Sequence, residues 1–258
     1  MTDSNPILEL VEVSINFGGL QAIDRLSFRV ENGEIFSLIG PNGAGKTTAI
    51  NVITGIYPPV EGEVYFEGQT LSKKRPYQIA RMGIARTFQN IQVFQNMSVR
   101  ENVMVGLHAR SRSEFVQSLL HTPMVHKEER MIRDRSDEIL EFMGLAPKAD
   151  LLASGLPYGD QKKVEIARTL ATAPKLLLLD EPAAGLNSQE THEMSRTILM
   201  IREKGVTVLL VAHDMNLVMG ISDTITVLNY GEKIADGHPG EIQNSERVVA
   251  AYLGREPW

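Results

Sequence analysis

The sequence of 258 residues contains no cysteine. This absence excludes disulfide bonds, thiol nucleophiles, iron–sulfur ligation and zinc sites built on cysteine. Long apolar runs are also absent from the sequence. The longest, at residues 176–179 and 206–212, have the length of strands, whereas a membrane-spanning helix needs about 20 apolar residues. The opening residues show no basic segment followed by an apolar one, so we expect no secretory signal. The chain is expected to stay on the cytoplasmic side and to meet a membrane only through a partner.

The sequence also lacks an excess of basic residues. Lys and Arg number 26 against 32 Asp and Glu, which gives a formal net charge of −6. Proteins that bind nucleic acid through overall positive charge show the opposite balance, so we expect no nucleic acid among the partners. Hydrophobic residues make up 43%, and the length suffices for a substantial core in one large domain or two small ones.

The order of the hydrophobic patterns predicts an α/β protein. Residues 175–179 and 207–211 are leucine- and valine-rich runs separated by a helix, which is typical of parallel strands buried on both faces. Shorter patterns precede them. They predict strands at 7–13, 26–30, 35–39 and 62–66, a break at 14–19, a hairpin at Asn32-Gly33 and a turn at Glu67-Gly68.

A stretch of different character runs from about residue 97 to 150. Ser98 followed by Glu101 is a capping-box pattern that predicts the start of a helix. Further helices are predicted at 107–120 and 127–143. The last of these mixes basic and acidic side chains, which indicates a solvated face rather than a phosphate-binding surface. We expect an α/β body interrupted by a helical insert.

A glycine-rich loop carries the most specific chemical pattern. Residues 40–47 fit G-x-x-x-x-G-K-[ST] and lie between an apolar run and a predicted helix. Glycines allow the backbone N–H groups to surround phosphates, and the helix N-terminus adds partial positive charge. Lys46 can reach the β- and γ-phosphates, and the Thr47 hydroxyl can bind Mg²⁺. The predicted nucleotide-binding residues of this loop are Gly40, Pro41, Asn42, Gly43, Ala44, Gly45, Lys46, Thr47 and Thr48.

Acidic residues and a histidine follow two of the predicted parallel strands. Ligands of such sheets bind at the carboxyl ends of the strands, so Asp180 can join the Mg²⁺ shell and Glu181 can polarise a water as general base. An acid after a strand can also be a simple helix cap. His213 could contact the γ-phosphate or hold the attacking water. A histidine in this position can also be structural, but we favour the functional interpretation because it follows another strand of the same sheet.

These motifs, in this order, resemble those of the nucleotide-binding subunits of ABC transporters. The resemblance implies that Gln89, in Thr87-Phe88-Gln89, touches Mg²⁺ or the water and senses the membrane partner. It implies that Phe17 stacks on adenine, although a core aromatic at a strand end is an equal alternative, and that residues 184–187 and His213 are the D-loop and the switch histidine. The implied signature motif, which would open a helix and contact the ATP of the opposite subunit, is Leu156, Pro157, Tyr158, Gly159, Asp160 and Gln161.

The resemblance also implies the fold and the assembly. The fold would be a P-loop NTPase (RecA-like) core with a mainly parallel sheet, an N-terminal antiparallel β subdomain and an inserted α-helical subdomain. Residues 1–90 and 160–258 would form the core, and residues 91–159 the helical subdomain. The implied cofactors are ATP and Mg²⁺. The implied partners are two membrane-spanning permease subunits, a second ABC ATPase and a periplasmic or lipid-anchored solute-binding protein, with this chain on the cytoplasmic face of the inner membrane.

A closer resemblance is to the branched-chain amino acid importer ATPases of the LivG type. ATPases of amide or urea importers and of lipopolysaccharide export share much of this pattern. A soluble ABC ATPase acting on DNA or ribosomes and a P-loop scaffold without turnover are further alternatives, and the intact Glu181 and His213 argue against the scaffold. The matching segments are 17–20, 86–89, 158–161, 180–187, 213–215 with 218–223, 251–254 and the insert around 108–130.

Three residues depart from the general family pattern. Pro157 replaces a serine whose hydroxyl donates to the partner's γ-phosphate, and proline lacks both the hydroxyl and the backbone N–H. Asp160 adds a negative charge where phosphate is expected, and Asn187 ends the D-loop in place of Asp. These changes are expected to weaken what this chain offers to its partner's nucleotide. They favour a heterodimer with a different ATPase over a homodimer.

Overall fold

The computed structural model describes residues 6–108 and 123–253, which fall into two compact units. The first unit comprises residues 1–86 and 175–258, and the second comprises residues 87–174. The predicted helix at 107–120 and the end of the segment 251–254 lie largely outside the described residues. Among the helices that are described, none combines the length and the apolar character needed to cross a membrane.

A mixed sheet forms the centre of the first unit. Within the described residues its order is β10-β9-β3-β8-β7-β6, and all neighbours are parallel except β9 and β10. Every residue of β3, β7 and β8 is buried, which confirms the prediction of parallel strands covered on both faces. The strands are β3 (Ile35–Ile39), β6 (Ile84–Arg86), β7 (Leu176–Asp180), β8 (Thr207–Val211), β9 (Thr224–Asn229) and β10 (Glu232–Gly237).

A smaller antiparallel sheet contains β1 (Leu8–Phe17), β2 (Leu20–Val30), β4 (Glu61–Phe66) and β5 (Gln69–Thr70), in the order β2-β1-β4-β5. The predicted break at 14–19 is wrong for residues 14–17, because β1 continues to Phe17, whereas Gly18 and Gly19 do form a turn before β2. Register shifts after Leu10 disturb the alternation, so the strand does not keep a period of two. The turn at Asn32-Gly33 is present, but it joins strands of different sheets and is therefore not a hairpin.

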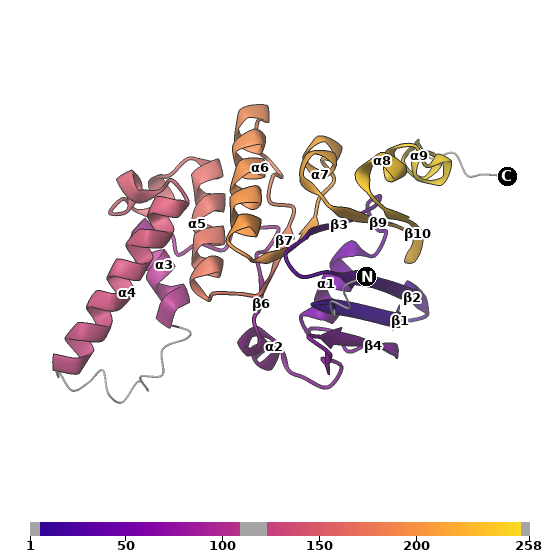
Figure 1. The fold of residues 1–258 in the computed structure, drawn as a ribbon, viewed down its shortest axis with the longest axis horizontal. Coiled ribbons are helices and arrows are strands. Elements are labelled where there is room, and N and C mark those ends of the chain that lie inside the picture. Colours follow the sequence, from indigo (N-terminus) through magenta and orange to yellow (C-terminus); the bar gives the residue numbers. More distant parts are fainter. Residues whose placement is uncertain (1–5, 109–122, 254–258) are drawn as a thin grey trace. The chain divides into compact units, whose positions relative to one another are not determined.

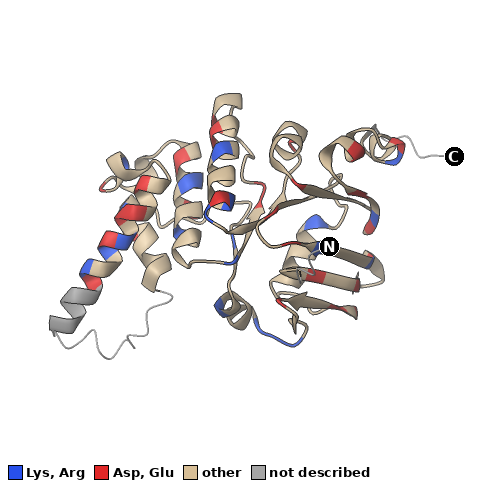
Figure 2. Ribbon diagram, viewed as in Figure 1, with Lys and Arg blue, Asp and Glu red and all other residues tan. Residues whose placement is uncertain are grey.

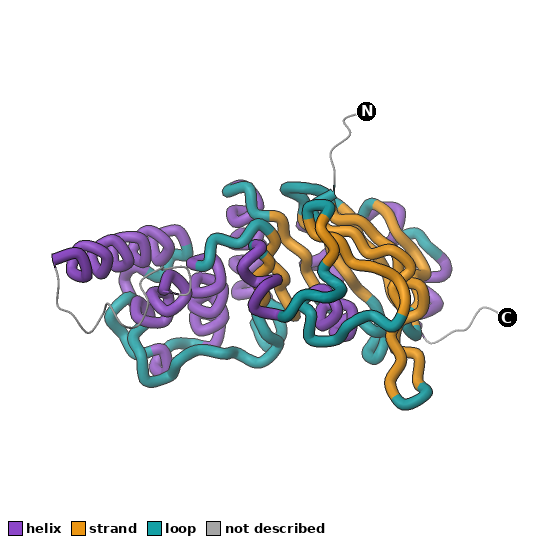
Figure 3. Tube along the Cα trace, turned by 90° about the horizontal axis from the view of Figure 1, so that it is seen from below, coloured by secondary structure: helices purple, strands orange, loops and turns teal. Residues whose placement is uncertain are grey.

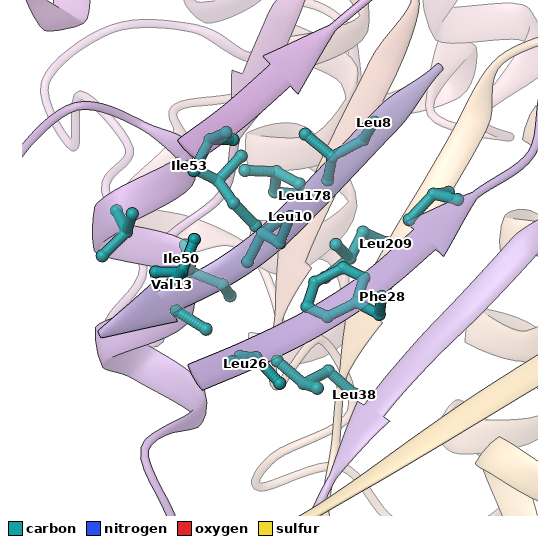
Figure 4. Packing of buried hydrophobic residues seen from close by; sticks show 14 of the residues in the cluster. Leu8, Leu10, Val13, Leu26, Phe28, Leu38, Ile50, Ile53, Leu178 and Leu209 are labelled. Atoms are coloured by element: carbon teal, nitrogen blue, oxygen red, sulfur yellow. The ribbon is translucent and has the colours of Figure 1, made fainter. Parts of the chain in front are cut away.

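The hydrophobic core of the first unit lies between the two sheets. Figure 1 shows α6 (Ser188–Glu203) and α7 (Met215–Ile221) on one face of the mixed sheet, and α1 (Lys46–Ile53) with the antiparallel sheet on the other. Alternate residues of the buried strands, such as Leu178 and Leu209, enter the core from the mixed sheet, where they meet Leu10 and Phe28 (Figure 4). The remaining helices of this unit are α2 (Pro76–Met82), α8 (Pro239–Gln243) and α9 (Glu246–Leu253).

The second unit contains helices joined by loops over its described residues (Figure 3). It contains α3 (Val99–His108), α4 (Pro123–Phe142) and α5 (Tyr158–Ala171), with short 3₁₀ turns at Ala146–Lys148 and Ala153–Gly155. The predicted capping box is confirmed, since the backbone N–H of Ser98 donates to Glu101 Oε2 at 2.7 Å and that of Glu101 to Ser98 Oγ at 3.2 Å. Figure 2 shows both signs of charge along α4, as a solvated face requires.

Helix α5 packs against α3 and α4, so this unit continues beyond residue 159 to Pro174. Gly106 of α3 lies where this helix approaches α5 closely. A Cβ atom at Gly106 would clash with the Arg168 carbonyl oxygen of α5, at a distance of 2.2 Å. Any residue with a side chain would therefore force the two helices apart.

Candidate nucleotide-binding site

The glycine-rich loop connects β3 to α1, as predicted. A Cβ atom at Gly40 would lie 2.1 Å from the Leu228 carbonyl oxygen, and one at Gly45 would lie 2.7 Å from the Ala22 carbonyl oxygen. Gly45 has φ of +102° and precedes the first residue of α1. Gly40 also has a positive φ, of +150°, so the loop needs glycine at both positions for backbone clearance and for conformation. The first N–H groups of a helix have no acceptor within it, so the start of α1 is the kind of cradle that binds phosphate.

Lys46 begins helix α1 and lies within the loop. Its side chain is buried, and Nζ donates to the Gly40 carbonyl at 2.7 Å and to the Pro41 carbonyl at 2.9 Å. Burial lowers the pKa of the Lys46 ammonium group, while the charges of Glu181 and Asp180 oppose that shift. The ammonium group thus lies close enough to both carboxylates to interact with them electrostatically.

Asp180, the last residue of β7, is paired with Arg86, which is itself bonded to a residue of α1. Arg86 of β6 donates from Nη2 to Asp180 Oδ2 at 2.8 Å, and from Nη1 to Asn51 Oδ1 of α1 at 2.7 Å. The Arg86 and Asp180 side chains are 10% and 4% exposed. The Asp180 carboxylate is therefore fixed at the carboxyl edge of the sheet by a buried, hydrogen-bonded ion pair.

Glu181, the next residue in the chain, has an unusual backbone conformation. Its φ is +50°, in the left-handed region that residues with side chains rarely adopt, and its N–H donates to the Val211 carbonyl at 2.7 Å. Its Oε1 lies 3.6 Å from Nδ1 of His213. Glu181 and His213 come from the ends of the neighbouring parallel strands β7 and β8, which is the juxtaposition that their order in the sequence predicts. Strained backbone of this kind is concentrated at functional sites.

Phe17 ends β1 and is 42% exposed, so it is not the core aromatic that was the alternative. Its ring meets that of Tyr57 edge to face, with centroids 5.1 Å apart. An exposed ring supported in this way can offer a face to a flat ligand. Thr47 is exposed at the start of α1 and Thr48 is partly buried.

The second unit brings Gln89 and the segment 156–161 together. Lys162, directly after that segment, is 1% exposed, and its Nζ lies 3.4 Å from the Gln89 carbonyl oxygen and 5.7 Å from the centroid of the Tyr158 ring. Pro157 occupies the N-cap position of α5 without a side-chain hydrogen bond, and Gln161 Nε2 donates to the Leu156 carbonyl at 2.9 Å. Gly159 is buried in the first turn of α5.

Two of the departures from the family pattern have partners within the fold. Asp160 forms an ion pair with Lys148, so the expected unbalanced negative charge at this position is compensated. Asn187 caps α6: its Oδ1 accepts from the N–H groups of Gln189 and Glu190, both at 3.0 Å, and Glu190 completes a capping box. The amide of Asn187 thus serves as an N-cap as well as a carboxylate would.

Sequence reasoning missed three buried charged residues that hold the predicted site residues. Arg86 was noted only as part of a motif, although a charged residue ending the apolar run Ile84–Arg86 was a usable signal. Lys162 and Glu165 are 1% and 2% exposed on α5, and their spacing of three residues places them on one helix face. A single sequence cannot distinguish such buried charges from ordinary surface ones.

A glycine-rich loop between a strand and a helix, with acidic residues and a histidine at the ends of neighbouring parallel strands, defines a P-loop nucleotide-binding protein of the α/β class. The family model described as "ABC transporter" matches residues 23–184, and that described as "Branched-chain amino acid ATP-binding cassette transporter" matches residues 232–257. The chain belongs to the ABC transporter family and is one of its ATP-binding cassette ATPases.

Relatives match over nearly the whole chain. The high-affinity branched-chain amino acid transport ATP-binding protein LivG of Escherichia coli (strain K12) is 45% identical over 97% of this chain and 99% of its own length. The protein named BraF, of the same description, from Pseudomonas aeruginosa is 43% identical with the same coverage. The crystal structure of the ADP conformation of MJ1267, an ATP-binding cassette of an ABC transporter, superposes with a TM-score of 0.85 at 36% identity over 97% of this chain and 99% of that one.

Proposed function

We propose that this chain is the ATP-hydrolysing subunit of an importer for branched-chain amino acids. The observation that carries the proposal is the convergence of Lys46, Asp180, Glu181 and His213 at the carboxyl edge of one parallel sheet. Relatives matching over 97% of the chain are branched-chain amino acid transport proteins, which supports the choice of solute. An amide or urea importer and a lipopolysaccharide exporter are alternative assemblies for the same ATPase, because no residue of this site needs to touch the solute.

Residues 40–48 would hold the phosphates of ATP, and Phe17 would stack on the adenine. Lys46 would exchange its bonds to the loop carbonyls for the β- and γ-phosphate oxygens. Mg²⁺ bound with nucleotide phosphates needs only one or two protein oxygens, and Thr47, Asp180 and Gln89 supply oxygens of the kind it prefers. Mg²⁺ would neutralise the charge that develops on the transferring phosphoryl group.

Glu181 would act as general base toward the attacking water. A carboxylate is suited to accept that proton, and His213 lies near enough to orient either the water or Glu181 itself. Of these two consecutive acids only Glu181 has a left-handed backbone, and they would serve the water and the metal separately. Residues 156–161 would complete the ATP site of a second ATPase subunit.

The assembly would contain two permease subunits, a second ATPase and a periplasmic or lipid-anchored binding protein, with this chain peripheral on the cytoplasmic face of the inner membrane. Pro157 supplies no hydroxyl to the partner's nucleotide, so we propose a heterodimer as the active form. The site completed by Pro157 would turn over more slowly. Losing a hydrogen bond to a charged phosphate costs about 1.5–3 kcal/mol, or one to two decades in rate.

Glu181→Gln tests the catalytic proposal in the assembled complex. We expect ATP to bind with unchanged affinity while hydrolysis stops and an ATP-bound closed dimer accumulates, because an amide cannot act as a base. Glu203→Gln, at an exposed position on α6, is the control and should hydrolyse ATP at the wild-type rate. An unchanged kcat in Glu181→Gln would remove this residue from the mechanism.

Disabling each subunit's catalytic glutamate separately tests the heterodimer. Disabling Glu181 should remove most of the ATPase activity of the complex, and disabling its counterpart should remove little. Uptake of radiolabelled leucine by proteoliposomes, with urea as the competing solute, tests the substrate class. Equal losses from the two sites, or a fully active homodimer of this chain, would refute the asymmetric assembly.

A further inference from the structure

Helix α5 carries a row of three charged residues that face the segment containing Gln89. Lys162, Glu165 and Arg168 are spaced three residues apart, so they lie along one side of the helix. Lys162 and Glu165 are 1% and 2% exposed. Buried charges are costly unless they are paired and hydrogen-bonded, so a row of this kind requires partners.

The partners of Glu165 are backbone groups on both sides of Gln89. The N–H of Phe88 donates to Glu165 Oε1 at 3.2 Å, and the backbone of Gln92 forms a further hydrogen bond with the same carboxylate. A carboxylate that receives two backbone N–H groups fixes the path of the chain between them. Residues 88–92 are thus bound to α5 through the main chain.

Lys162 and Arg168, on either side of Glu165 along α5, add further contacts between this helix and the chain near Gln89. Lys162 Nζ lies 3.4 Å from the Gln89 carbonyl oxygen and above the ring of Tyr158, which belongs to the proposed signature segment. The Arg168 guanidinium lies 5.2 Å from the centroid of the Phe94 ring, a cation–π distance. Helix α5 therefore contains most of the signature segment and also contacts Gln89 and the exposed Phe94.

We propose that Glu165 is a positioning residue for Gln89. Glu165 and Lys162 hold the backbone of residues 88–92 on the signature helix while the Gln89 side chain stays exposed, so Gln89 and the signature segment move as one body. A displacement of Phe94 by a membrane partner would then move both Gln89 and the signature segment. This inference rests on the proposed function for its consequence, but the attachment itself can be measured without it.

Asn102 of α3 anchors the other end of the segment and provides a comparison. Its Oδ1 accepts from the Phe94 N–H at 2.8 Å, and its Nδ2 donates to the carbonyls of Phe94 and Ser98 at 3.0 and 2.9 Å. Glu165 and Asn102 thus restrain different amides. Their loss should leave different signatures in hydrogen exchange.

The experiment compares Glu165→Leu, Glu165→Gln, Asn102→Leu and Val164→Ala in the purified full chain and in the complex. Val164 is fully buried on α5 but belongs to another face, so its truncation loosens the helix without removing the carboxylate. In Glu165→Leu we expect exchange of the Phe88 and Gln92 amides to accelerate at least about tenfold, with ATP affinity unchanged and kcat about tenfold lower. Glu165→Gln retains an acceptor and should recover most of both properties.

Asn102→Leu should accelerate exchange at Phe94 but not at Phe88, and Val164→Ala should change neither amide selectively. The inference is overturned by unchanged exchange at Phe88 and Gln92 in Glu165→Leu, by faster exchange with wild-type kcat, or by equal effects of Val164→Ala. If Glu165→Leu does not fold, Glu165→Gln decides. Hydrogen exchange of the Phe88 and Gln92 amides that is faster than in the wild type, but by less than about tenfold, supports the proposal, and unchanged exchange overturns it. A wild-type chain that neither binds nor hydrolyses ATP would refute the proposed function instead.

Discussion

Replacing Arg86 by methionine removes the guanidinium of the Arg86–Asp180 pair while keeping a side chain of similar length. Asp180, 4% exposed, then loses its ion-pair partner Arg86 in a buried site, and Asn51 loses a donor. Breaking a buried ion pair on one side costs about 3–5 kcal/mol, because the remaining charge is left uncompensated. The lost bond to the Asn51 amide falls within that figure.

For a folding unit of about 150–250 residues, each kcal/mol lowers the melting temperature by about 2–4 °C. We therefore expect Arg86→Met to melt roughly 6–20 °C below the wild type, measured by differential scanning calorimetry on the full chain without nucleotide. A double variant with Asp180→Asn should recover part of this loss, because the uncompensated charge is then gone.

Arg29→Met is the matched control. Arg29 Nε lies 2.7 Å from Glu9 Oε1, but the two side chains are 69% and 25% exposed, so this pair is worth at most about 1 kcal/mol. A difference of about 2 °C in melting temperature corresponds to at most about 1 kcal/mol. If Arg86→Met melts within about 2 °C of Arg29→Met, Asp180 does not depend on Arg86. The same result would refute the inference that the ion pair fixes this carboxylate.

Three further predictions concern the nucleotide site and the second unit. Lys46→Ala should abolish ATP turnover in the assembled complex, because it removes a positive charge from the transferring phosphate; turnover at the wild-type rate would contradict the phosphate-loop assignment. Phe94→Ala and Met97→Ala, at positions 47% and 37% exposed, should lower transport per ATP hydrolysed while ATP binding persists. The exposed Met131 of α4 supplies the control, and parallel loss of ATP binding would count against the prediction. Burial raises the pKa of Glu165 above its ordinary 4.5. The backbone hydrogen bonds from Phe88 and Gln92 and the charges of Arg168 and Lys162 lower it, but by less than burial raises it. Its contribution to stability is then complete below pH 4.5 and is lost as pH rises through the folded pKa, so urea titrations should show the wild type losing stability relative to Glu165→Gln over that interval.

The parallel part of the fold could be predicted because its signals are local. Fully apolar runs such as Leu176–Leu179 have one stable environment, a strand covered on both faces, and the order of the runs places their carboxyl ends at one edge. The placement of Glu181 and His213 could be predicted for the same reason, since each comes within two residues of a strand end, and that of Lys46 from the glycine-rich motif between a strand and a helix. Strand β1 was harder, because its bulges shift the register within Leu8–Phe17 and conceal the alternation.

The supports of the site could not be predicted, because they depend on contacts between elements far apart in the chain. Arg86 and Asp180 are separated by 94 positions, and Phe88 and Glu165 by 77. No periodicity within either segment specifies those pairs. The extent of the second unit was uncertain for a related reason. Whether α5 belongs with α3 or with the mixed sheet is decided by packing, such as the contact at Gly106, and not by the motif that opens the helix.

The signature segment shows why a charge in a sequence cannot be assigned to an interaction before its neighbours are known. Asp160 was expected to repel the partner's phosphate, yet Lys148 compensates it within the same unit, and Lys162 adds a buried cation beside Tyr158. The missing hydroxyl at Pro157 has no such compensation, because proline supplies neither of the two donors that serine would. Of the two defects expected in this segment, the charge of Asp160 is compensated and the missing donors of Pro157 are not. The asymmetry proposed for the two ATP sites therefore rests on a lost hydrogen bond and not on charge repulsion. It should accordingly change little with ionic strength, whereas repulsion between exposed charges would be screened by salt.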